Sequence, residues 1–241
     1  GGAWKWVLGG VAFLAVIAVT VVVTITYMKS HDSDSSSGLS GAPSDIASAN
    51  DKGPVGIITD DPSCGPWNPV ATAIAKTEDN GWGERDPSIP ASAWTPDMRA
   101  KYEAVGNAMR EAARGAIPLA KMTTHRVMRE LYGQIIFYSR AYADSISNYS
   151  PRDDILAQIA STAGNVVTDI CSAISTGAAA SRASLVKTPT SPKMFAPIGD
   201  ISNPAPIFTK PDTVCTDLSP TLSTLLNDPT FKAWLNTDPA I

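Results

Sequence analysis

The side chains in this sequence that are best suited to chemistry are three cysteines and two histidines. The cysteines are Cys64, Cys171 and Cys215, and the histidines are His31 and His125. Cysteines spaced this widely fit neither a zinc site nor a CxxC redox pair. Outside the cytoplasm, cysteines are expected to pair in disulfides, and an odd number leaves one to be explained. The sequence therefore favours structural disulfide chemistry.

No catalytic motif accompanies these residues. The sequence lacks the GxSxG, HExxH, Walker, GxGxxG and CxxC patterns. His125 is expected to be an exposed residue in the first turn of a helix, where it has no nucleophile to activate. Acids occur as the adjacent pairs Asp60–Asp61 and Asp153–Asp154. Neighbours on a helix do not face each other, and the second pair suits charge stabilisation at a helix start. We expect no enzymatic activity, no metal and no cofactor.

The overall charge also excludes one class of partner. The 241 residues carry a formal net charge of -4, and the pI is near 5.1. Because a nucleic-acid-binding domain carries a basic surface, no nucleic acid is expected as a partner.

An uncharged run of 23 residues, Trp6 to Met28, stands near the start of the chain. About 20 helical residues cross the hydrocarbon core of a bilayer, whereas the apolar core of a signal peptide has only about 7–15 residues. We therefore predict a single-pass transmembrane anchor over residues 1–29. Small residues on this helix could pack against a partner helix, although a lone anchor has a similar composition: Gly9, Gly10, Ala12 and Ala15.

The orientation of the anchor is argued from its flanks. Lys5 and Lys29 make the positive-inside comparison a tie. The following segment, residues 30–56, is polar, acidic and rich in Ser and Gly, which is typical of a flexible stalk. This flank and the cysteines favour a cytoplasmic N-terminus in the cell inner membrane, with most of the chain outside the cytoplasm in the periplasm. Because the chain starts at Gly1 rather than Met, further cytoplasmic residues are expected before it.

Four amphipathic helices are predicted within residues 57–177, and no period-two strand pattern persists, so the fold class is all-α. The expected helices run from about Pro66 to Glu78, Pro96 to near Pro118, Thr124 to about Asn148, and Pro151 to Gly177. Thr95, Pro96 and Asp97 form an N-cap, an N1 proline and a first-turn acid. The last helix has an expected core-facing stripe of Ile155, Ile159, Ala163, Val166, Ile170 and Ile174.

An up-down-up-down bundle is the simplest arrangement of four such helices. It places the start of the first helix and the end of the fourth at the same end of the bundle. Cys64 and Cys171 occupy these two places, so we predict a disulfide between them. Closing a loop of 107 residues (171 minus 64) stabilises the fold by about 4–5 kcal/mol on the chain-entropy model.

The rest of the chain is predicted to be a Pro-rich extended connector, residues 178–213, and a partial second copy, residues 214–241. Cys64 is followed by Pro69, Trp82 and the sequence DPSI, and Cys215 is followed by Pro220, Trp234 and the sequence DPAI at nearly the same offsets. This match predicts that a second bundle begins at the tail and continues after residue 241, where Cys215 would find its partner. The alternative is a terminal helix packed on the first bundle, with Cys215 free or paired elsewhere.

Several segments of the chain are distinctive: the WKW entry to the anchor, the Ser-rich stalk, and the runs SCGPWNP, DPSIPASAWTP, MREAARGAIPLAK, HRVMRELYGQ and YSRAYADSISNY. Together they resemble actinobacterial, especially mycobacterial, single-pass cell-envelope proteins of uncharacterised function. The resemblance implies an accessory subunit of a large envelope complex. The chain looks most like the accessory subunit of a mammalian-cell-entry (Mce) lipid importer, and next like a respiratory supercomplex subunit.

The expected function is therefore a membrane-anchored, non-enzymatic accessory or scaffolding subunit of an envelope transport complex, with integral membrane subunits as partners and lipid import as the process. The alternative is an extracytoplasmic module that binds a lipid or another apolar ligand between its helices. An enclosed cavity would favour that alternative, and a filled core would remove it. The residues that would line it are Met98, Met109, Met128, Tyr132 and Ile135.

Overall fold

The computed structural model describes residues 45–207 and 213–235, and in these residues every regular element is helical. The predicted anchor at 1–29, with Gly9, Gly10, Ala12 and Ala15, and most of the predicted stalk lie outside the described residues. In the ranges that are described, no helix combines the length and hydrophobicity needed to cross a membrane.

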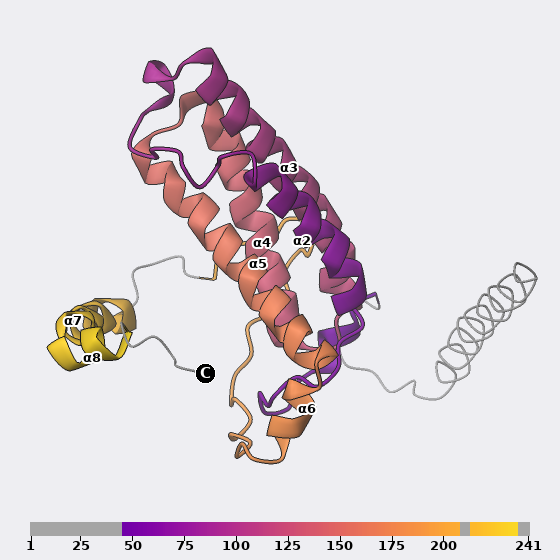
Figure 1. The fold of residues 1–241 in the computed structure, drawn as a ribbon. Helices are drawn as coiled ribbons and strands as arrows, with labels where there is room; N and C mark the ends of the chain where they lie inside the picture. Colours follow the sequence, from indigo (N-terminus) through magenta and orange to yellow (C-terminus); the bar gives the residue numbers. More distant parts are fainter. Residues whose placement is uncertain (1–44, 208–212, 236–241) are drawn as a thin grey trace, which may run out of the picture. The chain divides into compact units, whose positions relative to one another are not determined.

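Four long helices form an antiparallel bundle in which successive helices run in opposite directions (Figure 1). They are α2 (Cys64–Glu78), α3 (Pro96–Met122), α4 (Arg126–Ser145) and α5 (Asp154–Ser175). Short 3-10 turns flank them: η1 (Ala47–Asn50), η2 (Ala91–Ala93), η3 (Ile146–Asn148) and η4 (Pro151–Asp153). The up-down-up-down arrangement expected from the sequence is present.

The start of α3 is encoded as the sequence predicts. Thr95 has extended backbone angles, and its hydroxyl accepts a hydrogen bond from the Met98 N–H at 3.2 Å. Pro96 stands at N1, where its missing N–H costs nothing, and Asp97 follows in the first turn. The core-facing side chains of this helix repeat at helical spacing and are buried: Tyr102, Val105, Met109, Ala112 and Ala116.

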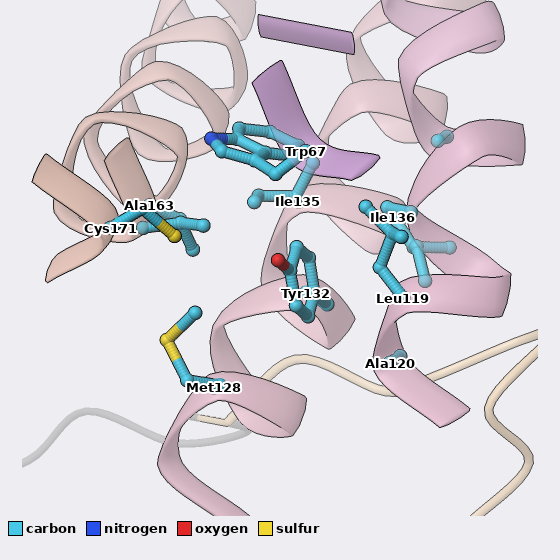
Figure 2. Packing of buried hydrophobic residues seen from close by; sticks show 12 residues of the cluster. Trp67, Leu119, Ala120, Met128, Tyr132, Ile135, Ile136, Ala163 and Cys171 are labelled. Carbon is cyan, nitrogen blue, oxygen red and sulfur yellow. The ribbon is translucent and has the colours of Figure 1, made fainter. Parts of the chain in front are cut away.

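The hydrophobic core at the Cys64 end of the bundle is built around Trp67 (Figure 2). The Trp67 ring lies edge-on to Tyr132 with centroids 5.7 Å apart, and its indole N–H donates to the Thr168 hydroxyl at 2.9 Å. A Cβ built on Gly164 would lie 3.6 Å from the Trp67 ring, so α2 approaches α5 closely at this point. The other labelled side chains fill the space around these rings: Leu119, Ala120, Met128, Ile135, Ile136, Ala163 and Cys171.

A second, aromatic core closes the opposite end. Trp94 stacks on Tyr102 with ring centroids 3.9 Å apart, and Trp82 meets Tyr102 edge-on at 5.0 Å. The guanidinium of Arg85 lies 3.7 Å from the centroid of the Trp82 ring and pairs with the buried Asp154 of α5. The irregular segment between α2 and α3 is therefore folded onto the bundle end by rings and one buried ion pair.

The face that α5 presents to the core differs from the predicted one. Ile155 and Val166 are 52% and 39% exposed, and the other isoleucines of the predicted stripe are half-buried, with Ile170 packed against the core. The buried residues of α5 are Asp154, Ala157, Ala160, Ala163, Val167 and Cys171. Large rings from α2 and α4 already occupy the interior, so only small side chains fit on the facing side of α5. The predicted face is therefore correct at Ala163 and Ile170 and wrong at Ile155 and Val166.

Two predicted boundaries are also wrong. Helix α3 continues past Pro118 to Met122. Proline removes one helical hydrogen bond, and the burial of Leu119 and Ala120, at 3% and 1% exposure, stabilises the last turn in compensation. Helix α4 begins at Arg126 rather than Thr124, since the chain turns at buried Thr123.

The predicted stalk and connector contain folded pieces. Ser48 of η1 and its N-cap residue Ile46, within the stretch 30–56 predicted to be flexible, are buried against the bundle. Residues 178–213, predicted to be extended, begin with the short helix α6 (Ala178–Ala183). The tail holds α7 (Thr213–Asn227) and α8 (Pro229–Leu235), which contact each other.

Candidate binding site beneath the connector

The predicted disulfide is present and fixes one end of the bundle. Cys64 and Cys171 are bonded, with Cα atoms 5.3 Å apart and a sequence separation of 107 residues. Cys171 is buried within the hydrophobic core, and Cys64 packs against that core from its edge. The bond therefore links the first residue of α2 to the end of α5 and acts as a structural crosslink.

Next to the disulfide lies a buried hydrogen-bond network centred on Asp61. The Ser63 hydroxyl donates to Asp61 Oδ1 at 2.5 Å, and the Thr123 hydroxyl donates to Asp61 Oδ2 at 2.5 Å. The Tyr132 hydroxyl donates to Ser63 Oγ at 2.9 Å. All four residues are buried, and burial raises the pKa of Tyr132 to about 12. These polar groups form hydrogen bonds with one another, so the network stabilises this end of the bundle and leaves no reactive group free.

His125 has a structural role in the same corner. It is the half-buried N-cap residue of α4 rather than an exposed first-turn residue as predicted. Its Nε2 lies 3.0 Å from the Asp60 carbonyl oxygen, and its backbone N–H donates to the Thr123 hydroxyl at 3.2 Å. His125 has no nucleophile among its described partners. Its contacts connect the segment before α2 with the turn between α3 and α4, so its role is structural.

The second acidic pair divides its roles. Asp153 closes a capping box, because its carboxylate accepts hydrogen bonds from both the N–H and the hydroxyl of Ser150. This is the helix-start role that the sequence predicts. Asp154, in contrast, is buried and holds Arg85, while the Gln158 side-chain amide donates to it at 2.7 Å.

A hollow lies between the bundle and the connector. Its volume is about 700 Å³, within the range of about 300–1,000 Å³ that is usual for ligand sites. Its floor is formed by η1 and α4, and its cover by residues 192–207. The site therefore depends on how the connector is held against α4.

The connector is attached to α4 by backbone groups. The Gln134 side-chain oxygen accepts from the Ile207 N–H at 3.1 Å, and its amide makes a long hydrogen bond of 3.5 Å to the Ala205 carbonyl. Arg140 donates to the Ser202 carbonyl at 2.5 Å. A Cβ built on Gly133 would lie 3.6 Å from Pro204, so the connector passes close to α4 there. These contacts fix a chain segment that has no regular structure of its own.

The charged groups in the floor are largely paired with each other. Arg126 donates to the Asp51 carboxylate at 3.0 Å, and its own backbone N–H donates to the same carboxylate at 2.7 Å. Arg129 donates to the Ser48 hydroxyl at 2.9 Å and pairs with Glu130 at 3.1 Å. The Phe195 ring of the connector lies over Arg126 at 5.2 Å. The hollow therefore combines an apolar cover with a floor in which most charges are paired, while Nη2 of Arg126 is buried without a hydrogen-bond partner.

The predicted alternative cavity between the helices is almost filled. Met109, Met128, Tyr132 and Ile135 are buried in the two cores, and Met98 is half-buried. A hollow of only about 100 Å³ remains between α2 and α5, bordered by Trp67, Met109 and Ile135. Burial raises the pKa of Glu78 at its rim, against the opposing effect of Arg85. This space is too small for a drug-sized ligand or lipid chain.

The residues that form the connector site were not found by sequence reasoning. Arg126, Arg129 and Gln134 stand in the run HRVMRELYGQ, which was noted only as part of a resemblance. Their spacing places Arg126 and Arg129 on one helix face, but nothing local identifies the η1 backbone and the connector as their partners. The described residues also contain no group of three or more metal-ligating side chains.

Comparison with known proteins places this chain among mycobacterial proteins. A family profile described as Mycobacterial ESX-1 associated protein matches residues 46–241. An uncharacterized protein of Mycolicibacterium smegmatis (strain MKD8) is 47% identical over 245 aligned residues, which cover 100% of this chain and 64% of that protein. No solved structure matches.

These findings refine the resemblance drawn from the sequence. The mycobacterial family is confirmed, whereas the likeness to a mammalian-cell-entry importer is not shown. The chain spans less than two thirds of the length of its M. smegmatis relative. With a match that covers residues 46–241, the chain belongs to the family of mycobacterial ESX-1-associated proteins.

Proposed function

We propose that this protein is a non-enzymatic accessory subunit that works with the ESX-1 secretion machinery at the mycobacterial cell envelope. The observation that carries the proposal is the family match over residues 46–241. The transport complex served is thus a secretion system, in place of the lipid importer expected from the sequence. The bundle acts as a rigid module that positions other components.

The use of polar groups supports a scaffolding role. Asp61, Ser63, Thr123 and Tyr132 satisfy one another in the interior, and Asp154 is bound by Arg85 and Gln158. Such networks stabilise a single packing arrangement. A scaffold needs a rigid shape, and an internal disulfide together with two filled cores supplies it.

Two features support the proposed site of action, an apolar run in the sequence and the disulfide. The uncharged run from Trp6 to Met28 is long enough for one membrane span. Disulfides persist outside the cytoplasm and are rare within it, so the Cys64–Cys171 bond supports an extracytoplasmic bundle. We place the N-terminus in the cytoplasm, the anchor in the inner membrane and the bundle on the far side.

A ligand-binding role is the second candidate, and the hollow beneath the connector favours it. Its volume of about 700 Å³ and its cover of Phe195, Ile198 and proline side chains suit an apolar molecule. Binding of a lipid at this place, rather than between the helices, is compatible with the filled cores. In this role the protein would present or remove a lipid for the complex.

Affinity purification of the tagged full-length protein from mycobacterial membranes in mild detergent tests the first proposal. We expect membrane subunits of ESX-1 to be recovered with it. We also expect the anchor to carry the attachment, so that deletion of residues 56–241 leaves the recovery unchanged while Gly9→Leu with Gly10→Leu reduces it. Val22→Leu is the matched control within the anchor.

Two results would contradict different parts of the proposal. Recovery of a lipid importer or a respiratory complex in place of ESX-1 subunits would show that ESX-1 is not the partner complex. Loss of ESX-1 subunits on deletion of residues 56–241 would move the attachment to the bundle. The ligand-binding role, the second candidate, is tested by mass spectrometry of the lipids that the purified protein retains. That role requires one retained lipid class.

A further inference from the structure

Helix α7 carries an apolar stripe that stays about half exposed in the described part of the chain. Leu218, Leu222, Leu225 and Leu226 repeat at spacings of 4, 3 and 1, which places them on one helix face. Each is 46–55% exposed. Four leucines aligned in this way are typical of a helix face that is buried in its functional state.

The stripe stands in register with the inward face of α2. Both helices contain a proline five residues after a cysteine, Pro69 in α2 and Pro220 in α7. When Cys64 is aligned with Cys215, each residue of α2 corresponds to the residue 151 positions later in the chain. The positions equivalent to the four leucines are then Trp67, Ala71, Ile74 and Ala75.

Three of these four positions of α2, Trp67, Ala71 and Ile74, are buried or half-buried against the bundle, whereas Ala75 is exposed. Trp67 is 1% exposed and central to the core, and Ala71 packs against that core. Ile74 and Ala75 join them along the small hollow between α2 and α5. The two helices therefore match in the spacing of cysteine and proline, and the leucine stripe of α7 also corresponds to the face of α2 that packs in the bundle. The outward position Thr72 corresponds to Ser223, and both are exposed.

We propose that the leucine stripe of α7 is the docking face for a second set of three helices, built like α3–α5 and carried by the intact polypeptide outside residues 1–241. In this arrangement α7 takes the place of α2 in a second bundle. Helices of a repeat cannot bury an apolar face alone and need the rest of the unit to cover it.

Two observations favour this occupant over a second copy of the protein. The M. smegmatis relative aligns with the whole of this chain and has a further 36% of its own length outside the alignment (100% minus 64%), so family members have room for further helices. Cys171 is already bonded to Cys64, so the sequence from 1 to 241 holds no cysteine for Cys215. The register assigns Cys215 the role of Cys64, whose partner lies on the last helix of its bundle.

Disulfide mapping of the intact protein tests the proposal. The protein is purified from mycobacterial membranes after free thiols are blocked, and its peptides are analysed without reduction. We expect Cys215 to be linked to a cysteine of the same polypeptide outside residues 1–241. A link between Cys215 residues of two copies, a link to Cys171, or a free Cys215 thiol would each overturn the proposal.

Variants of the stripe provide a second measurement. Leu222→Asp with Leu225→Asp should expose Cys215 to reduction by a mild thiol and raise its maleimide labelling by about tenfold or more, since two buried leucines are lost. Thr224→Asp, on the opposite face of α7, should leave labelling at the wild-type level. Equal labelling of the three proteins would contradict the proposal. The Cys64–Cys171 bond is the internal reference, because it should stay intact in all of them.

Discussion

Cys64 and Cys171 are bonded across 107 residues of sequence, so that the first residue of α2 is tied to the end of α5. The intervening chain forms the whole bundle, including both hydrophobic cores. One covalent bond thus restricts the unfolded ensemble of the entire folded unit.

Removal of this bond should lower stability without changing the fold. Cys171→Ser is expected to reduce the free energy of unfolding by about 4–5 kcal/mol on the chain-entropy model. Urea unfolding followed by tryptophan fluorescence measures the loss, and reduction of the wild-type protein should reproduce it. Ser172→Ala, at the exposed neighbouring position, is the control and should change stability by less than about 0.5 kcal/mol. An unchanged midpoint on reduction would contradict this role of the bond.

The hydroxyl of Thr123 is expected to be required as a donor to Asp61. Thr123→Val keeps the shape of the side chain but leaves a buried carboxylate oxygen without its 2.5 Å partner. The expected loss of stability is about 1–3 kcal/mol. Thr123→Ser keeps the hydroxyl and should retain most of the stability. Equal unfolding midpoints for the two variants would show that packing, rather than the hydrogen bond, matters at this position.

Three buried tyrosines predict a loss of stability at alkaline pH. Burial raises the pKa of Tyr132 to about 12, and it also raises the pKa of Tyr142 and Tyr149. The native state holds these phenols neutral, whereas the unfolded chain releases their protons near pH 10. The stability from this source is therefore complete below about pH 10 and is lost as pH rises through about 12.

Tyr132→Phe should remove part of this alkaline loss. Unfolding midpoints measured from neutral pH to pH 12 should fall less steeply for the variant than for the wild-type protein. Tyr138→Phe, at a half-exposed position on the same helix, is the matched control. If the two variants follow the same pH profile, the alkaline transition arises elsewhere.

The connector should depend on Gln134 for its position. Gln134→Leu removes the acceptor of the Ile207 N–H and the donor to Ala205 together. Hydrogen exchange of the backbone amides between residues 192 and 207 should then become faster by about tenfold, the effect of losing about 1.4 kcal/mol of local stability. Exchange in α3 should not change, and it serves as the internal control. Unchanged exchange at Ile207 would mean that apolar contacts alone hold the connector.

Local patterns predicted the helices, whereas three-dimensional packing decided which faces they bury. The Thr95-Pro96-Asp97 signal and the stripe of α3 depend only on neighbouring residues, and both are found as expected. The buried face of α5 depends on rings contributed by α2 and α4, so the predicted stripe is exposed at Ile155 and Val166 and buried at Ala163. Pro118 likewise shows that tertiary burial can extend a helix past a local stop.

The candidate site was less predictable than the fold. Its floor combines α4 with η1, whose sequence is small and polar and resembles a stalk. The contacts that hold η1 in place come from Arg126 and Arg129, about 75–81 residues later in the chain. A single sequence carries no periodicity from which such pairings can be inferred. The Cys64–Cys171 pairing was accessible because topology alone brings those positions together.

The export of ESX-1 substrates by a mycobacterial strain that lacks this protein tests the proposed association most directly. The amount of these substrates in the culture filtrate is compared among the deletion strain, the same strain complemented with the wild-type gene, and the parent strain, with uptake of a labelled lipid measured in parallel. A fall in ESX-1 export that complementation restores, with lipid uptake unchanged, is the predicted result. Normal ESX-1 export together with reduced lipid uptake would contradict the proposed function.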